Sequence, residues 1–215
     1  MTGPDPRVLV VTAVEAERLA VARGLGYRAV VLAGGVGQAA AAATTARAIA
    51  TAPRSYDLVL CAGIAGGFDG RADLGSTVLA ARSIAADLGA ESPDGFIDLD
   101  ELGFGTSTVE VDPTALAGLR RALPYAPVGD VLTVSTVTGT AERAAALRDR
   151  YPSAVAEGME GFGVAPAAAQ AGVAFAEIRT ISNPVGPRQR VAWRIGDALT
   201  ALEAAAARLA DSLER

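Results

Sequence analysis

The chain has 215 residues, 51% of them hydrophobic, and a formal net charge of −5. This length can bury one sizeable core, so we expect a single domain over residues 1–215. Histidine and lysine are both absent, which excludes a Ser-His-Asp triad, a Schiff-base lysine, a P-loop lysine and a histidine-ligated metal. Catalysis must therefore use carboxylates, amides, hydroxyls, arginines and backbone groups, and the sequence implies neither a metal nor an organic cofactor.

The single cysteine and the charge pattern exclude further classes. Cys61 can form no internal disulfide, and it follows an apolar run, which favours a buried thiol over a nucleophile. No basic cluster is present, which argues against nucleic-acid binding. No apolar run reaches the roughly eighteen residues that span a bilayer, and the polar start lacks a signal-peptide apolar region. We expect a soluble, cytoplasmic protein without a membrane partner.

Apolar, β-branched runs alternate with Ala-rich helical stretches. The expected strands are Val8–Thr12, Ala29–Ala33, Leu58–Cys61, Ser76–Ala81, Val131–Ser135, Ala154–Glu157 and Val173–Ile181. The expected helices are Val14–Gly24, Gly37–Ala50, Pro113–Ala122, Ala141–Arg150, Met159–Ala171 and Val191–Leu213. This order predicts a three-layer α/β sandwich, with a central mixed, mostly parallel twisted sheet between helices.

Two carboxylates open the first expected helix, directly after the first strand. Glu15 and Glu17 could simply stabilise the helix N-terminus, by about 0.3–1 kcal/mol each. Ligands of α/β sheets bind beyond the carboxyl ends of the strands. One of the two carboxylates could therefore face a site and act as a general base.

Glycine-rich turns are expected after the next two strands, at Gly34–Gly37 and Gly63–Gly67. The first resembles a dinucleotide-binding fingerprint, but a strand already precedes it, and Asp57 comes before its strand rather than after it. We favour a tight turn whose amides face a small ligand or water. Residues 85–108 lose the periodic pattern, which indicates a long surface excursion that could cover the active site.

The last third of the chain adds polar groups at two further strand ends. Met159 and Glu160 begin a helix after the strand Ala154–Glu157, in which Glu157 is expected to be structural. Glu160 could be a first-turn charge or could accept hydrogen bonds from two ribose hydroxyls. Asn183 follows the last strand and could be a turn residue or could offer a purine a donor and an acceptor on one planar group.

Several arginines crowd the same neighbourhood as Asn183. They are Arg179, Arg188, Arg190 and Arg194. One could pair with Glu177 and one could meet an anionic group of a substrate. Trp193 could belong to the core, to an interface or to a stacking surface.

These motifs, in their order and spacing, resemble the nucleoside phosphorylase/nucleosidase superfamily, most closely its methylthioadenosine/S-adenosylhomocysteine nucleosidase and futalosine hydrolase branches. The resembling segments, over almost the full length, are Ala13–Glu17, Gly35–Ala41, Ala62–Gly67, Leu74–Val78, Met159–Gly161 and Arg179–Asn183. The resemblance implies a homodimer or higher homo-oligomer that binds a small purine nucleoside.

The resemblance also implies roles for individual residues. Glu17 would activate the attacking water, Glu160 would bind the ribose 2′- and 3′-hydroxyls, and Met159 would pack against the sugar. Asn183 stands where the adenine-cleaving branch has an Asp that protonates purine N7. The other expected substrate contacts are Ile64, Ala65, Gly66, Phe162, Ser182 and Arg188.

The Asn at position 183 decides between the branches. A carboxamide cannot act as a general acid, but its NH₂ can donate to a 6-oxo group or to N7. A 6-oxopurine also leaves more readily, because its lactam spreads negative charge over the ring. The resemblance therefore favours hydrolysis of futalosine, an inosine-like nucleoside with a 5′-linked aryl carboxylate that belongs to a menaquinone route, with release of hypoxanthine.

Three alternatives stay open from the sequence. An adenine-type nucleosidase would use methylthioadenosine, and a phosphorylase would need an anion site, for which Arg82 is the nearest candidate. Glu17 would repel phosphate, which favours hydrolysis. A nucleoside-binding sensor without catalysis would not need Glu17 at all.

Overall fold

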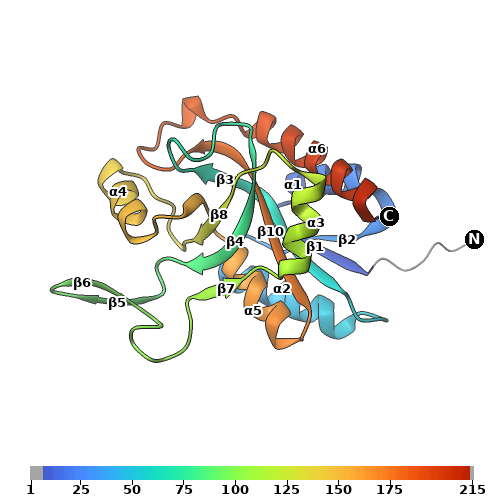
Figure 1. Cartoon of the computed structure of the whole chain (residues 1–215), viewed down its shortest axis with the longest axis horizontal. Coiled ribbons are helices and arrows are strands. Elements are labelled where there is room, and N and C mark those ends of the chain that lie inside the picture. Colours follow the sequence, from blue (N-terminus) through green and yellow to red (C-terminus); the bar gives the residue numbers. More distant parts are fainter. Residues whose placement is uncertain (1–6, 214–215) are drawn as a thin grey trace, which may run out of the picture.

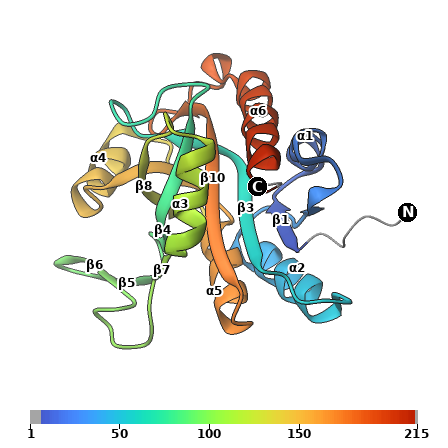
Figure 2. The ribbon, with the colours of Figure 1, turned by 45° about the vertical axis from the view of Figure 1, so that its right-hand side comes forward.

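A computed structural model describes residues 7–213 and confirms the expected α/β architecture, with a mixed sheet between two helical layers (Figures 1 and 2). The strands are β1 (Val8–Thr12), β2 (Val30–Ala33), β3 (Leu58–Gly67), β4 (Thr77–Ala85), β5 (Gly89–Ser92), β6 (Gly95–Asp98), β7 (Thr108–Glu110), β8 (Val128–Thr133), β9 (Ala154–Gly158) and β10 (Ala174–Pro184). The helices are α1 (Glu15–Leu25), α2 (Gln38–Thr51), α3 (Pro113–Ala122), α4 (Ala141–Arg150), α5 (Gly161–Gln170) and α6 (Ile195–Leu213).

The helices begin where local chemistry satisfies their free amides. The Asp112 carboxylate accepts from the N–H of Ala115 at 2.8 Å at the start of α3, and Pro113 occupies the first turn. At the start of α4, the Thr140 hydroxyl accepts from the N–H of Arg143 at 3.2 Å. These caps explain why both helices start at the residue that the sequence predicts.

The sheet curls on itself because β3 and β10 are long. The strand order is β10-β4-β8-β9-β3-β1-β2, and β10 also pairs with β3, so β3, β9, β8, β4 and β10 form a closed ring of strands. Most pairs are parallel, whereas β10–β4, β3–β9 and β4–β7 are antiparallel. The ring brings the carboxyl ends of β3, β9 and β10 together.

The turn expected at Gly63–Gly67 is wrong, because β3 continues through these glycines to Gly67. A side chain at Gly67 would collide with neighbouring segments of the same polypeptide. A Cβ on Gly67 would lie 2.6 Å from the carbonyl oxygen of Ala72 and 2.7 Å from Cγ2 of Ile181. The glycines thus permit close pairing rather than a reversal of the chain.

The two helical layers pack on opposite faces of the sheet. Helices α1, α3 and α6 cover one face, and α2 and α5 cover the other (Figure 2). Residues 85–108 hold the β5–β6 hairpin, which projects away from the main sheet (Figure 1). Within the described residues, no helix is both long and apolar enough to cross a membrane.

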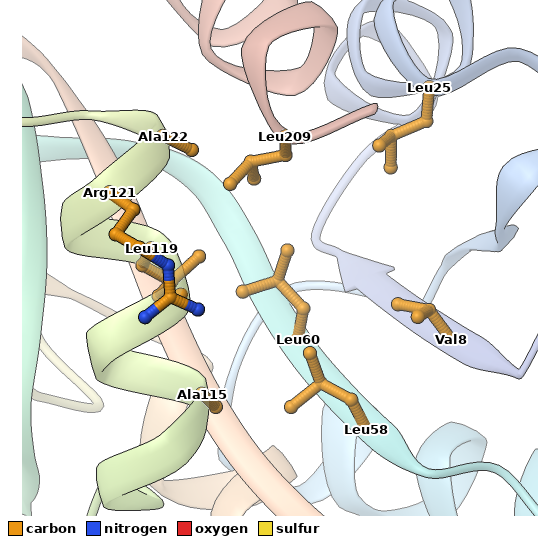
Figure 3. A pocket seen from close by; sticks show the side chains of 10 residues that line it. Val8, Leu25, Leu58, Leu60, Ala115, Leu119, Arg121, Ala122 and Leu209 are labelled. Atoms are coloured by element: carbon orange, nitrogen blue, oxygen red, sulfur yellow. The ribbon is translucent and has the colours of Figure 1, made fainter. Parts of the chain in front are cut away.

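A cavity of about 670 Å³ lies at the amino ends of β1 and β3, beneath α3 and α6. Figure 3 shows Leu60, Leu119 and Leu209 pointing toward one another across it. Its lining is apolar except for Arg121, so it offers no carboxylate or amide to a polar substrate.

The contact between α1 and α6 requires Gly24. A Cβ there would lie 2.5 Å from both Cβ of Ala206 and the carbonyl oxygen of Glu203. We expect Gly24→Ala to lower the free energy of unfolding, because overpacking costs about 1–3 kcal/mol and exceeds the helix-propensity gain of about 0.5–1 kcal/mol. Thermal or denaturant unfolding measures the difference.

Gly118→Ala in α3 is the matched control. The nearest atom to its new Cβ is Nη2 of the flexible Arg121 side chain, at 3.7 Å. This variant should gain about 0.5–1 kcal/mol of helix propensity. Equal stabilisation by both substitutions would contradict the close approach of α1 and α6.

Candidate active site

A second cavity, of about 240 Å³, opens at the carboxyl ends of β3, β9 and β10, at the opposite end of β3 from the apolar cavity. The structure brings nine of the ten expected site residues to it. They are Glu17, Ile64, Ala65, Gly66, Met159, Glu160, Ser182, Asn183 and Arg188.

Glu17 lies in the first turn of α1 and is 3% exposed. Its Oε2 accepts from the backbone N–H groups of Ala13 at 2.9 Å and Val14 at 3.1 Å, and its Oε1 accepts from that of Ile64 at 2.8 Å. Glu15, by contrast, points to solvent and pairs with Arg18. Glu17 therefore closes the first helical turn and also lines the cavity.

Glu160 ends the loop before α5 and is joined to a buried arginine. Its Oε2 accepts from Nη1 of Arg179 at 3.2 Å, and its Oε1 accepts from the N–H of Gly37 at 3.3 Å. The turn Gly34–Gly37, expected to face a ligand or water, thus presents one amide to a carboxylate of the site. Gly37 has a φ of 92°, which suits glycine alone in such a tight turn.

Arg179 is 1% exposed and contacts three elements. Its Nε donates to Oε1 of Glu177 at 2.9 Å, and its Nη2 lies 3.2 Å from Sγ of Cys61. Burial alone disfavours the charged form, but the nearby carboxylates raise the pKa of the Arg179 guanidinium, so the group stays charged. Burial also raises the pKa of the Cys61 thiol, in agreement with the expected inert cysteine.

Asn183 reaches the cavity from the end of β10. Its Oδ1 accepts from the Ser182 hydroxyl at 2.8 Å, and its Nδ2 donates to the carbonyl oxygen of Pro184 at 3.0 Å. These two bonds fix the orientation of the amide and leave the second N–H of Nδ2 available for a ligand.

Arg188 and Trp193 form the mouth of the cavity. The guanidinium carbon of Arg188 lies 5.6 Å from the centre of the Trp193 ring, within cation–π range. Arg188 is the sole cation among the lining residues, and its side chain is exposed. Trp193 is therefore placed at the site rather than in the core.

Phe162 is the expected contact that does not line the cavity. Its backbone N–H donates to the Thr133 hydroxyl at 2.9 Å, and its side chain lines an Ala-rich groove between α2 and α5. The excursion 85–108 likewise contributes no lining residue to the candidate site, so the covering role expected for it is not seen within this chain.

Sequence reasoning missed Glu157 as a cavity residue. It lies in β9, is 5% exposed and accepts from Thr138 through both oxygens, at 2.9 Å from the N–H and 2.5 Å from the hydroxyl. Burial raises the pKa of Glu157, and the hydrogen bonds from Thr138 oppose that rise. The sequence signal that could have identified Glu157 as a cavity residue is a charged side chain inside an otherwise apolar strand.

Known proteins resemble this chain in both sequence and fold. The family model of the phosphorylase superfamily matches residues 11–215. The chain belongs to this superfamily. It is 52% identical to a futalosine hydrolase of Streptomyces coelicolor over 96% of both chains, and 50% identical to one of Acidothermus cellulolyticus, over 94% of this chain and 89% of that one.

Solved structures support the same fold. A futalosine hydrolase of Helicobacter pylori superposes with a TM-score of 0.81 over 98% of this chain and 97% of that one, at 17% sequence identity. At such low identity the likeness concerns the fold alone.

The superfamily is named for phosphorylases, and Arg82 is the candidate that the sequence offers for a phosphate-binding site. Its guanidinium forms two bonds to Asp130, at 2.8 Å from Nε and 2.5 Å from Nη2, and it does not line the cavity. Three carboxylates, those of Glu17, Glu157 and Glu160, do line it. A phosphate ion would meet repulsion there, which favours water as the nucleophile.

The arginine at the centre of the site yields a stability prediction. We expect Arg179→Met to cost about 3–5 kcal/mol of unfolding free energy, because it leaves buried Glu177 and Glu160 without their cation. Denaturant unfolding measures the loss. Arg23→Ala, which removes an exposed ion pair with Glu203, should have a far smaller effect, and equal losses would argue against the buried cluster.

Proposed function

We propose that this protein hydrolyses the N-glycosidic bond of futalosine and releases hypoxanthine and the dehypoxanthinyl sugar, a step of menaquinone biosynthesis. The observation that carries the proposal is the convergence of the Glu17 carboxylate and the Asn183 amide on one cavity, whose single lining cation is the exposed Arg188. The 52% identity to the Streptomyces coelicolor futalosine hydrolase supports the choice of substrate.

Glu17 is the proposed general base. Its three backbone donors hold the carboxylate at the cavity wall, where it takes a proton from the water that attacks the anomeric carbon. The new C–O bond forms as the C–N bond to the purine breaks, and the bonding electrons leave with the base. The purine anion then takes up a proton from water to become hypoxanthine, and Glu17 returns the proton it accepted to water. No metal is required for this displacement.

Glu160 and Met159 are the proposed sugar contacts. A carboxylate accepts two O–H donors at once, so Glu160 can bind both ribose hydroxyls. Its negative charge also stabilises the positive charge that develops on the sugar. The bonds from Arg179 and Gly37 hold the carboxylate in one orientation.

Asn183 is the proposed partner of the leaving base. With its amide fixed by Ser182 and Pro184, the remaining N–H donates to N7 or to the 6-oxo group. This bond stabilises the electrons that the purine carries away, without the full proton transfer that an adenine needs.

Arg188 is the proposed contact for the aryl carboxylate of the 5′ substituent. It stands at the mouth of the cavity and is the cation that the lining provides. Trp193, next to it, offers a flat apolar face for the aryl ring.

The proposed assembly is a homodimer or a higher homo-oligomer, as the resemblance implies. A groove between α2 and α5, lined mainly by alanines and by Phe162, is a face that a second copy could cover.

Product analysis tests the function directly. In phosphate-free buffer, chromatography should detect hypoxanthine released from futalosine, with little base released from methylthioadenosine. Release that requires phosphate would identify a phosphorylase. Preferential release of adenine from methylthioadenosine would overturn the proposed substrate. No release of base from either nucleoside would favour a nucleoside-binding sensor.

Within that assay, Glu17→Gln should lower kcat by roughly 10²–10⁴-fold, because the amide cannot accept the proton of the attacking water. Calorimetry should show that Glu17→Gln still binds hypoxanthine, and this binding would show that the variant is folded. Glu15→Gln, two residues away on the exposed side of α1, is the matched control and should retain full activity. Normal turnover by Glu17→Gln would refute the mechanism.

Arg188→Ala should raise KM for futalosine by roughly 2- to 5-fold and leave kcat nearly unchanged, because an exposed charge pair contributes modest, uniform binding. Steady-state kinetics with inosine, which lacks the carboxylate, should show no such change. Arg190→Ala is the control, since Arg190 also lies near Trp193 but does not line the cavity. Equal losses on both substrates would remove Arg188 from this role.

A further inference from the structure

Glu157 is a buried cavity residue to which the proposed mechanism gives no role. Across the sheet, the register pairs Glu157 of β9 with Gly66 of β3, and Gly66 with Asn183 of β10. Side chains at paired positions project to the same face. Glu157 and Asn183 therefore flank Gly66 on one face of the sheet.

Gly66 leaves the centre of this row without a side chain. A Cβ there would lie 2.9 Å from Cγ2 of Val185 and 3.3 Å from Nδ2 of Asn183. The two polar residues are separated by two strand spacings, about 9.5 Å between backbones. The side chains of Val185 and Asn183 thus fill the space over Gly66. Glu157 and Asn183 both line the cavity, which places a carboxylate and an amide around one space that suits a planar heterocycle with polar edges.

The hydrogen bonds of Glu157 define what it can offer a ligand. Both oxygens already accept from Thr138, through its N–H and its hydroxyl. Burial raises the pKa of Glu157, whereas the two donors of Thr138 favour its ionised form. In the ionised form each oxygen keeps a further lone pair, so Glu157 then presents an acceptor to the cavity.

We propose that Glu157 is a specificity-determining residue that accepts a hydrogen bond from N1–H of a 6-oxopurine, while Asn183 binds the N7 or 6-oxo edge of the same ring. This inference rests on the proposed function and assigns the recognition of its leaving base. The lactam of hypoxanthine carries a hydrogen on N1, which matches the carboxylate. Adenine carries a lone pair on N1, which would face the carboxylate without a proton between them.

A purely structural role for Glu157 makes a different prediction. If the carboxylate only anchors the loop at Thr138, its loss should weaken the binding of every purine equally. If it also binds N1, replacement by an amide should change the preference between bases. In Glu157→Gln, the amide oxygen can still accept from Thr138, and the NH₂ can then donate to N1 of adenine.

The experiment compares kcat/KM of wild type and Glu157→Gln for futalosine and for its 6-amino analogue. We expect the preference for the 6-oxo substrate to fall on the order of 100-fold, because the wrong group leaves a buried partner unpaired. The control Glu142→Gln, at an exposed carboxylate in α4, should keep the wild-type ratio. An unchanged ratio, or equal losses on both substrates, would overturn the proposal.

Binding of the free bases separates this proposal from the choice of futalosine as substrate. Calorimetry with hypoxanthine and adenine needs no 5′ substituent. If futalosine is not cleaved but wild type prefers hypoxanthine and Glu157→Gln does not, the substrate is wrong and the role of Glu157 stands. If the variant fails to fold, wild type can be tested with 1-methylhypoxanthine, and binding as tight as that of hypoxanthine would refute the contact at N1.

Discussion

The ion pairs of Arg179 hold the site together. One guanidinium, almost fully buried, bridges Glu177 on its own strand and Glu160 at the start of α5, and it lies against Cys61 of β3. A Cβ on Gly63 would lie 2.8 Å from Oε1 of Glu17 and 3.0 Å from Nη1 of Arg179, so this glycine leaves the space in which the two groups meet. Several buried carboxylates this close together would repel one another, and the charge of Arg179 offsets that repulsion.

The sequence predicted those parts of the fold and site that depend on local rules. Alternating strands and helices follow from periodicity, and the structure caps two of the helix starts predicted in this way with Asp112 and Thr140. Glu17, Glu160 and Asn183 follow from their places after strands, because carboxyl ends of strands gather ligand sites. The resemblance then supplied the chemistry that position alone leaves open.

What the sequence did not predict depends on contacts between distant segments. The continuation of β3 through its glycines is decided by the pairing of Gly66 and Gly67 with β9, which no local pattern contains. The sequence predicted a structural role for Glu157. Nothing near it in the sequence shows that it accepts hydrogen bonds from Thr138 and lines the cavity. Phe162 shows the opposite error, in which a predicted site residue lies elsewhere. It follows Glu160 by two positions, but its side chain lines the groove between α2 and α5.

Glu17, the proposed general base, also contributes to the stability of the fold. Catalytic groups commonly lower the stability of a protein, and substitutions that remove them often stabilise it. Here the main-chain donors that orient the carboxylate also fasten α1 to β3. With Glu17 as the general base that we propose, selection for abundance in the cell and selection for turnover act on this position in the same direction, and both oppose the loss of glutamate.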